Sequence, residues 1–276
     1  MLTRQQIRLQ ERALVKRGQA VVAAGLPPTP DKQDIVAVAV VLARMLRNRD
    51  DPERALAAAR LIHGLNEAST RKSPGTAKLA CAKGCGYCCH NWVGATVPEI
   101  LLLAASVRNA GRAKPDLVAG ILERTKATAG VSRSGRFGAK LPCPLLVDDR
   151  CSFYRERPAV CRQTTSLDLA GCLDEFDGRG YGGDIKVSGI YLAHARNSRV
   201  PLSAALRLAG LDTASYELSA GLARVMAEVD TGTRWLAGED MMAGIAKAPR
   251  EPAVDDAIAA IERELAPLMR DAGAGT

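Results

Sequence analysis

The chain has 276 residues, which is enough to bury a hydrophobic core as one large domain or two small ones. It therefore does not depend on cross-linked cysteines to fold, as a mini-protein would. Aromatic residues make up only 4% of the sequence and runs of β-branched residues are short, which favours helices over strands. No segment reaches the roughly 18–20 uninterrupted apolar residues that a membrane span requires.

The net charge of +8 is concentrated in the N-terminal part of the chain. Residues 1–80 contain 14 Lys or Arg against 7 Asp or Glu, whereas the remaining 196 residues contain 24 against 23. These basic helices are candidates for contact with nucleic acid, an anionic membrane surface or an acidic protein partner. Arg4, Arg8 and Arg12 also recur every four residues, which fits a solvated helix face. No aromatic residues are interleaved with the charges and no nucleic-acid-binding motif is present, so we do not expect nucleic acid as the partner.

The first 17 residues have no apolar segment between their charges and no small-residue cleavage site, unlike a secretory signal. A bacterial, cytoplasmic location is therefore expected, and thiols stay reduced there.

Three helices are predicted in the basic N-terminal part, before the first cysteine. The second starts with acidic and ends with basic residues, as the helix dipole favours, and Asp51-Pro52 fits the start of the third. The polar stretch 69–78 that follows predicts a loop. The three helices are predicted at residues 3–24, 31–48 and 51–66.

The rest of the chain also has mainly helical patterns. Residues 130–140 are rich in Gly and Ser and basic, which predicts a flexible connector, and residues 178–183 are rich in Gly. A weak strand pattern covers 185–190. Helices are predicted at residues 99–109, 115–129, 187–197, 201–210, 214–229 and 253–270. The predicted fold class is mainly α, with an irregular cysteine-rich metal-binding core and helical flanks, and the predicted domains are 1–77, 78–175 and 176–276.

All eight cysteines lie in the middle of the chain, and both flanks contain none. The first four follow the spacing C-x3-C-x2-C-C, in which Gly84 and Gly86 predict a turn that leads into a helix near Cys88. Such a turn points backbone N–H groups at sulfur, and a helix N-terminus favours the thiolate. Because Cys88 and Cys89 are adjacent, we expect their side chains to diverge. The cysteines are Cys81, Cys85, Cys88, Cys89, Cys143, Cys151, Cys161 and Cys172.

The second cysteine group begins at Cys143, which Pro142 and Pro144 hold in an extended backbone. Pro158 predicts the start of a short helix that carries Cys161. Four thiolates around one metal leave excess negative charge, and basic residues flank these cysteines. We therefore expect Arg157 or Arg162 to donate to sulfur and so to bind the cofactor.

Metal binding explains this pattern better than the alternatives do. Four cysteines in nine residues do not fit small buried hydrophobes, and disulfides do not fit a chain without a secretion signal. Eight thiols exceed the four that one zinc site uses, so two sites remain open, as do a structural role and a metal-carrier role. His90 could replace a thiolate, and Cys172 is the least certain ligand. The cysteine number, the Cys-Pro step and the flanking arginines favour an iron–sulfur cluster over zinc.

The combination of these motifs resembles the YkgJ-type cysteine-cluster family. It consists of C-x3-C-x2-C-C at 81–89, Cys-Pro-Leu-Leu at 143–146 and Cys-Ser-Phe-Tyr-Arg-Glu-Arg-Pro-Ala-Val-Cys-Arg at 151–162. The family is described as zinc- or iron-chelating, and the resemblance covers roughly residues 78–175. It implies chelation by Cys81, Cys85, Cys88, Cys89, Cys143, Cys151 and Cys161.

A more distant resemblance links this region to the cysteine-rich region of flagellin lysine methylase. It implies an alternative function, an iron–sulfur-dependent enzyme of the protein lysine methylation type. The sequence identifies no catalytic residue for such a reaction, so enzyme activity stays open at this point.

Overall fold

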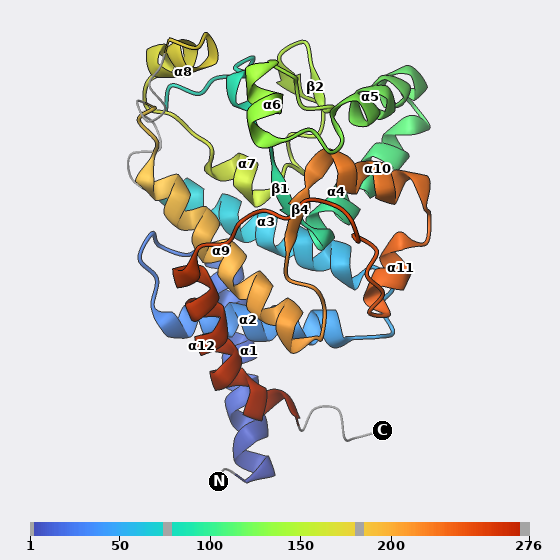
Figure 1. Cartoon of the computed structure of the whole chain (residues 1–276). Coiled ribbons are helices and arrows are strands. Elements are labelled where there is room, and N and C mark those ends of the chain that lie inside the picture. The colour runs from blue at the N-terminus through green and yellow to red at the C-terminus, as the bar shows by residue number, and fades with distance from the viewer. Residues whose placement is uncertain (1–2, 74–78, 180–184, 271–276) are drawn as a thin grey trace. The chain divides into compact units, whose positions relative to one another are not determined.

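The computed structural model describes residues 3–73, 79–179 and 185–270 (Figure 1). The chain forms two compact units, each built from separated stretches of sequence. Residues 1–73, 193–213 and 249–276 make up what we call the helical unit, and residues 74–192 and 214–248 make up the cysteine unit. In the described ranges no strand is longer than three residues, so the prediction of a mainly α fold is confirmed.

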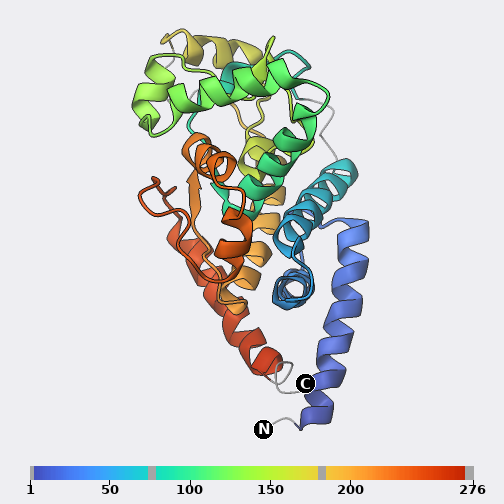
Figure 2. The same cartoon turned by 90° about the vertical axis from the view of Figure 1, so that its right-hand side faces the viewer.

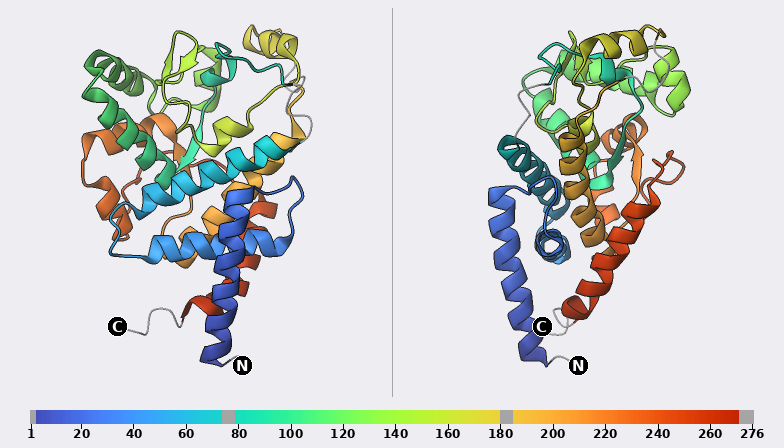
Figure 3. Two further views of the ribbon diagram at one scale, coloured as in Figure 1. Left: turned by 180° about the vertical axis from the view of Figure 1, so that it is seen from behind. Right: turned by 90° about the vertical axis from the view of Figure 1, so that its left-hand side faces the viewer.

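The helical unit consists of long helices packed around α2. Figures 2 and 3 show that α1 crosses α2 and α3, and all three helices contact one another. Because α12 also packs against α2, the apolar residues of α2 are buried around most of its circumference, including Val36, Val40 and Leu42. The helices are α1 (Arg4–Ala24), α2 (Lys32–Arg47), α3 (Arg54–Lys72), α12 (Pro252–Arg270) and the part of α9 (Gly189–Leu208) that follows residue 192.

The start of α1 and its contact with α2 follow from local chemistry. Thr3 and Gln6 form a capping box, in which each residue's side chain accepts a hydrogen bond from the other's backbone N–H. Gly18 lies where α1 meets α2, and a Cβ atom at this position would lie 2.3 Å from the backbone oxygen of Ala37. The missing side chain therefore permits this helix crossing.

His194 is buried in the helical unit, with 1% of its surface exposed. Its Nε2 atom contacts the hydroxyl of Ser73, which itself donates to the carbonyl oxygen of Ser69 at 3.1 Å. The Nδ1 atom is buried and has no hydrogen-bond partner among the described residues. Burial lowers the pKa of His194 because it disfavours the charged imidazolium.

The cysteine unit combines short helices with two small antiparallel sheets. Strand β1 (Gly94–Thr96) pairs with β4 (Ser215–Glu217), and β2 (Leu146–Val147) pairs with β3 (Arg150–Cys151). Each strand of the first sheet leads directly into a helix, β1 into α4 and β4 into α10. The helices are η2 (Tyr87–His90, a 3-10 helix), α4 (Val97–Gly111), α5 (Pro115–Thr128), α6 (Arg133–Gly138), α7 (Ala159–Gln163), α8 (Leu169–Phe176), α10 (Leu218–Ala227) and α11 (Thr231–Leu236).

The core of the cysteine unit lies where α4, α5 and α10 pack against one another. Ile100 and Leu103 of α4 and Leu222 of α10 are fully buried there. Gly221 permits the close approach of α10 to α4, since a Cβ atom at this position would lie 2.7 Å from Cδ1 of Ile100. The pairing of β1 with β4 therefore brings residues far apart in sequence into one core.

Two stretches predicted as loop contain helix. Helix α3 does not end near residue 66 but continues to Lys72, and the Ser69 hydroxyl donates to the Leu65 carbonyl at 2.7 Å and accepts from the Leu26 N–H at 2.8 Å. The connector predicted at 130–140 contains α6, which Ser132 caps through a 3.1 Å hydrogen bond from the N–H of Gly135. Residues 74–78 of the first predicted loop lie outside the described residues.

Three further predictions differ from the structure near the second half of the cysteine unit. The helices predicted at 187–197 and 201–210 form one helix, α9, with Pro201 inside it, because buried apolar residues on both sides of the proline hold the helix together. The helix predicted from residue 214 starts as strand β4, because that segment pairs with β1. In place of the strand at 185–190, Val187 forms a single bridge with Ser166 and α9 begins at Gly189. Residues 180–184, which include most of the Gly-rich stretch, lie outside the described residues.

Among the described residues, no helix has both the length and the apolar character that crossing a membrane requires.

We predict that Gly18→Ala destabilises the protein by about 1–3 kcal/mol, because the added methyl group overlaps the backbone of α2. Urea unfolding followed by circular dichroism measures this. The matched control is Gly64→Ala, since Gly64 is exposed within α3 and a Cβ atom there meets nothing within 4 Å. The control should be stabilised by about 0.4–1 kcal/mol. Equal effects of the two substitutions would contradict the close contact at Gly18.

We predict that His194 makes the stability depend on pH. Its folded-state pKa is lowered, so the unfolded chain takes up the proton first, at about pH 6.5. The contribution of neutral His194 to the free energy of unfolding is therefore complete above that pH. It is lost as the pH falls towards the folded-state pKa. The melting temperature should fall less between pH 7.5 and pH 5.5 for His194→Gln than for the wild type. An unchanged difference would count against this role.

Candidate metal centre

The first cysteine group lies on a turn followed by η2. Gly84 adopts a positive φ of 91°, as the turn requires, and Cys88 and Cys89 lie within η2, which agrees with the predicted turn and helix. Gly86 packs against the β2–β3 hairpin, because a Cβ atom there would lie 3.4 Å from Leu146 and Asp149 side-chain atoms. The turn therefore lies directly on the element that carries Cys151.

A backbone hydrogen bond connects the two cysteine groups. The N–H of Cys143 donates to the carbonyl oxygen of Cys89 at 2.7 Å, although 54 positions separate the two residues. The following hairpin then places Cys151 opposite Leu146. Its two-residue turn, Asp148-Asp149, has positive φ angles of 49° and 55°, which is the geometry of a type I′ turn.

Cys161 lies on α7, which begins directly after Pro158 as predicted. The N–H of Ala159, at the start of α7, donates to Oε1 of Glu99 at 2.7 Å. Glu99 is 3% exposed, and its other carboxylate oxygen accepts the N–H of Thr96 at 2.9 Å. This buried carboxylate therefore holds the start of α7 against the start of α4.

Cys81, the first cysteine of the first group, and Cys172, the last cysteine of the chain, are each held by a contact between segments far apart in sequence. The N–H of Ser166 donates to Sγ of Cys81 at 3.2 Å. Helix α8, which carries Cys172, packs against η2 through Phe176, whose ring centroid is 5.3 Å from Tyr87 and 4.8 Å from His90. The sequence makes Cys172 the most distant cysteine, whereas the structure places its helix beside the first group.

The thiol pKa values show which cysteines influence one another. Burial, followed by the charges of Cys143, Cys151 and Cys88, raises the pKa of Cys161 well above its ordinary value. Burial also raises the pKa of Cys143 to about 11. The pKa of Cys85 is raised by burial and, to a lesser extent, by the charges of Cys81, Cys88 and Cys172.

The pKa values of the adjacent thiols of Cys88 and Cys89 shift in opposite directions. A hydrogen bond between the two thiols lowers the pKa of Cys88 to about 7, and the same contact raises the pKa of Cys89. Cys88 is therefore the thiol of this pair that ionises first.

The two predicted cofactor-binding arginines have different surroundings. Arg162 is buried and donates from Nε to the carbonyl oxygen of Arg157 at 3.0 Å and from Nη2 to the carbonyl oxygen of Arg155. Arg157 lies over the ring of Tyr154 at 3.9 Å, and its charge lowers the pKa of Cys88 and Cys161. Its Nε atom is buried and has no hydrogen-bond partner among the described residues.

Two further arginines lie at the second cysteine group, and sequence reasoning missed both. Arg136 of α6 and Arg124 of α5 donate to the carbonyl oxygens of Pro142 and Pro144, on either side of Cys143. Residues 130–140 look like a flexible connector because of their glycines and serines, so no local signal indicates that Arg136 is buried. The partners that bury it lie on β4 and α10.

The donor chemistry of this region fits a thiophilic metal or cluster. All eight cysteines are free thiols, and Cys143 and Cys161 are held neutral by burial, a condition that metal coordination reverses by deprotonating the thiol. The buried, unpaired Nε atoms of Arg136 and Arg157 are suited to face an anionic centre. Within the described residues, however, no three or more Cys, His, Asp or Glu side chains are arranged to hold a metal ion. Coordination therefore requires the thiols to come closer together than they are here.

The cysteine unit therefore holds free thiols that are half-buried, apart from the exposed Cys81, and several basic side chains lie beside them. Residues 80–177 match the family model CxxCxxCC, described as "Putative zinc- or iron-chelating domain". The match covers about a third of the chain and supports metal binding by this part of it. No curated protein and no solved structure is significantly similar to the chain. The resemblance to flagellin lysine methylase therefore stays a prediction.

We predict that Cys88 is alkylated faster than Cys89, Cys143 and Cys161 in the metal-free protein at pH 7.5. At this pH the lowered pKa makes much of Cys88 thiolate, whereas the raised pKa values keep the other three protonated. Timed iodoacetamide labelling with peptide mass spectrometry gives the four rates. Cys89→Ala, which removes the side-chain donor, should slow the reaction of Cys88. Faster reaction of Cys89 than of Cys88 would reverse the assignment.

Proposed function

We propose that the cysteine unit binds an iron–sulfur cluster or zinc through clustered cysteine thiolates, with the iron–sulfur cluster favoured. The observation that carries this proposal is that cysteines from separate elements influence one another's pKa. The charges of these thiols act on Cys89 and Cys161, and a backbone hydrogen bond joins the two cysteine groups. The cysteines concerned are Cys88, Cys89, Cys143, Cys151 and Cys161. The proposed ligands are Cys81, Cys85, Cys88, Cys89, Cys143, Cys151 and Cys161.

The charge balance supports the same proposal. Four thiolates with zinc, or with an oxidised four-iron cluster, carry about −2, and burying that charge requires nearby donors. Arg157 meets this requirement because its charge acts on Cys88, Cys151 and Cys161 and its Nε atom is unpaired among the described residues. We propose that Arg157 donates to the bound centre and that Arg162 acts with it by fixing the backbone around residues 155–157.

The bound group would supply structural cross-linking if it is zinc, and electron transfer if it is an iron–sulfur cluster. The chain's own residues determine where it is held. Cys143 is fixed to Cys89 through the backbone, and Glu99 fixes the helix that carries Cys161. An iron–sulfur-dependent modifying enzyme of the lysine methylation type is the alternative function.

We further propose that the basic N-terminal helices bind a protein partner. Arg4, Arg8 and Arg12 are exposed along α1, so their charges are accessible within the helical unit. An acidic protein surface would complement them.

Metal analysis and visible absorption on protein purified without oxygen or chelator test the proposed function. Iron with matching acid-labile sulfide would identify a cluster, whereas a colourless protein with zinc would identify a zinc centre. Protein with neither metal would contradict the proposal.

We predict that Cys85→Ser and Cys151→Ser each lower metal retention about tenfold or more and destabilise the cysteine unit, because each removes a thiolate ligand. Competition with a chelator gives the retention, and Ser152→Ala, next to Cys151, is the control. Cys172→Ser should cause a smaller loss. Unchanged retention in both ligand variants would rule out the proposed ligand set.

A further inference from the structure

Besides a local turn bond from the N–H of Leu146 to the carbonyl oxygen of Cys143 at 2.9 Å, three hydrogen bonds connect the Pro142-Cys143-Pro144 segment to other elements. Arg136 Nη2 donates to the carbonyl oxygen of Pro142 at 3.4 Å, and Arg124 Nε donates to the carbonyl oxygen of Pro144 at 3.1 Å. The N–H of Cys143 donates to Cys89, as described above. Because proline has no N–H, the segment has few backbone groups through which it can be fixed. Each of the two carbonyls that flank Cys143 is bound by an arginine.

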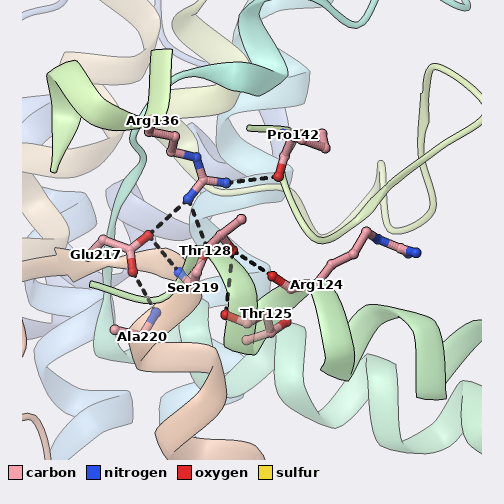
Figure 4. A network of polar contacts seen from close by, with 8 residues as sticks. All are labelled: Arg124, Thr125, Thr128, Arg136, Pro142, Glu217, Ser219 and Ala220. Carbon is pink, nitrogen blue, oxygen red and sulfur yellow. Dashed lines mark hydrogen bonds and ion pairs between the residues drawn. The ribbon is translucent and has the colours of Figure 1, made fainter. Parts of the chain in front are cut away.

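Arg136 is itself held rigidly inside the cysteine unit. Figure 4 shows its guanidinium between Glu217, Ser219 and Pro142. Its Nη1 atom lies 3.3 Å from Oε1 of Glu217 and 3.0 Å from Oγ of Ser219. Arg136 is 2% exposed and Glu217 is fully buried, so neither charge can be solvated if the pair separates.

The carboxylate of Glu217 is fixed in turn by the start of α10. Its Oε1 accepts the N–H of Ser219 at 2.9 Å and its Oε2 accepts the N–H of Ala220 at 2.6 Å. The Thr128 hydroxyl donates to Oγ of Ser219 at 3.0 Å, which links α5, the helix of Arg124, to the same network (Figure 4). Arg124 is connected to this network through its backbone carbonyl oxygen, which accepts the Thr128 hydroxyl at 2.9 Å.

Both arginines retain a buried donor that the protein does not use. Nε of Arg136 and Nη2 of Arg124 have no hydrogen-bond partner among the described residues. Leaving such groups unpaired is costly, and buried polar atoms are usually paired. Unused guanidinium donors beside a cysteine are suited to the excess negative charge of a metal–thiolate centre.

We propose that Arg124 and Arg136 form a clamp that positions Cys143 for metal binding, and that their unpaired N–H groups face the charge of the bound centre. This inference rests on the proposed metal-binding function and assigns to it two positioning residues. Arg136 is anchored by Glu217 and Ser219, which lie beyond the residues that match the family model. The working metal domain therefore includes the segment from β4 into α10.

The test compares clamp variants of the full chain with matched controls. Arg124→Gln removes one arm, and the double variant Arg136→Gln/Glu217→Gln removes the other without leaving a buried carboxylate unpaired. Arg133→Gln on α6 and Lys126→Gln on α5 are the controls, because both residues are exposed and neither contacts the segment. Two quantities are measured: hydrogen exchange of peptides covering residues 141–147 in the metal-free protein, and the binding of Co²⁺ alone by thiolate charge-transfer absorption with chelator competition.

We expect both clamp variants to exchange faster at residues 141–147 and to bind Co²⁺ about tenfold more weakly, with the controls unchanged. Unchanged exchange, or exchange that rises equally throughout the cysteine unit, would overturn the clamp. If the wild type binds Co²⁺ and the clamp variants bind it with the same affinity, the clamp is overturned and the proposed function stands. If the wild type binds no Co²⁺ and metal analysis finds neither iron nor zinc, the metal-binding function is overturned. Exchange that then rises only at residues 141–147 in the clamp variants would still support the two arginines as residues that hold Cys143 in place.

Discussion

The buried ion pair between Arg136 and Glu217 joins the two stretches of chain from which the cysteine unit is built. A charged pair with this little exposure is stable only when its remaining donors and acceptors are also bound. The N-terminal N–H groups of α10 bind the carboxylate, and Ser219 and Pro142 bind the guanidinium. The placement of Cys143 therefore depends on residues about 75 positions further along the chain.

A second buried carboxylate, that of Glu99, lies just after β1, the other strand of the same sheet, and also fixes a segment that carries a cysteine. Glu99 lies in the first turn of the helix after β1, and Glu217 caps the helix after β4. The positive end of the helix dipole favours a carboxylate at both places. Glu99 holds the helix of Cys161 and Glu217 holds the arginine beside Cys143, so one two-stranded sheet organises both cysteines.

Neutral thiols and unpaired guanidinium donors lie together in this unit, and the two features have a common explanation. Burial raises the pKa of Cys143 and Cys161, and Arg124, Arg136 and Arg157 each keep a buried side-chain nitrogen without a hydrogen-bond partner among the described residues. A metal or cluster bound as proposed would deprotonate these thiols, and the resulting thiolates would be anionic partners for the arginines.

The sequence by itself determined the helical class, the turn at Gly84, the helix after Pro158 and the cysteine region that matches a metal-chelating family. These features depend on local spacing and on residue chemistry, which can be read along the chain. Only the tertiary structure revealed α6, the strand at 215–217, the neighbourhood of Cys172 and the two arginines beside Cys143. Each of these depends on a partner distant in sequence. From the sequence, Arg136 is predicted to be an exposed loop residue, and its buried partner Glu217 lies 81 positions further along. The energy of a buried charge depends on its surroundings in space and not on its neighbours in sequence.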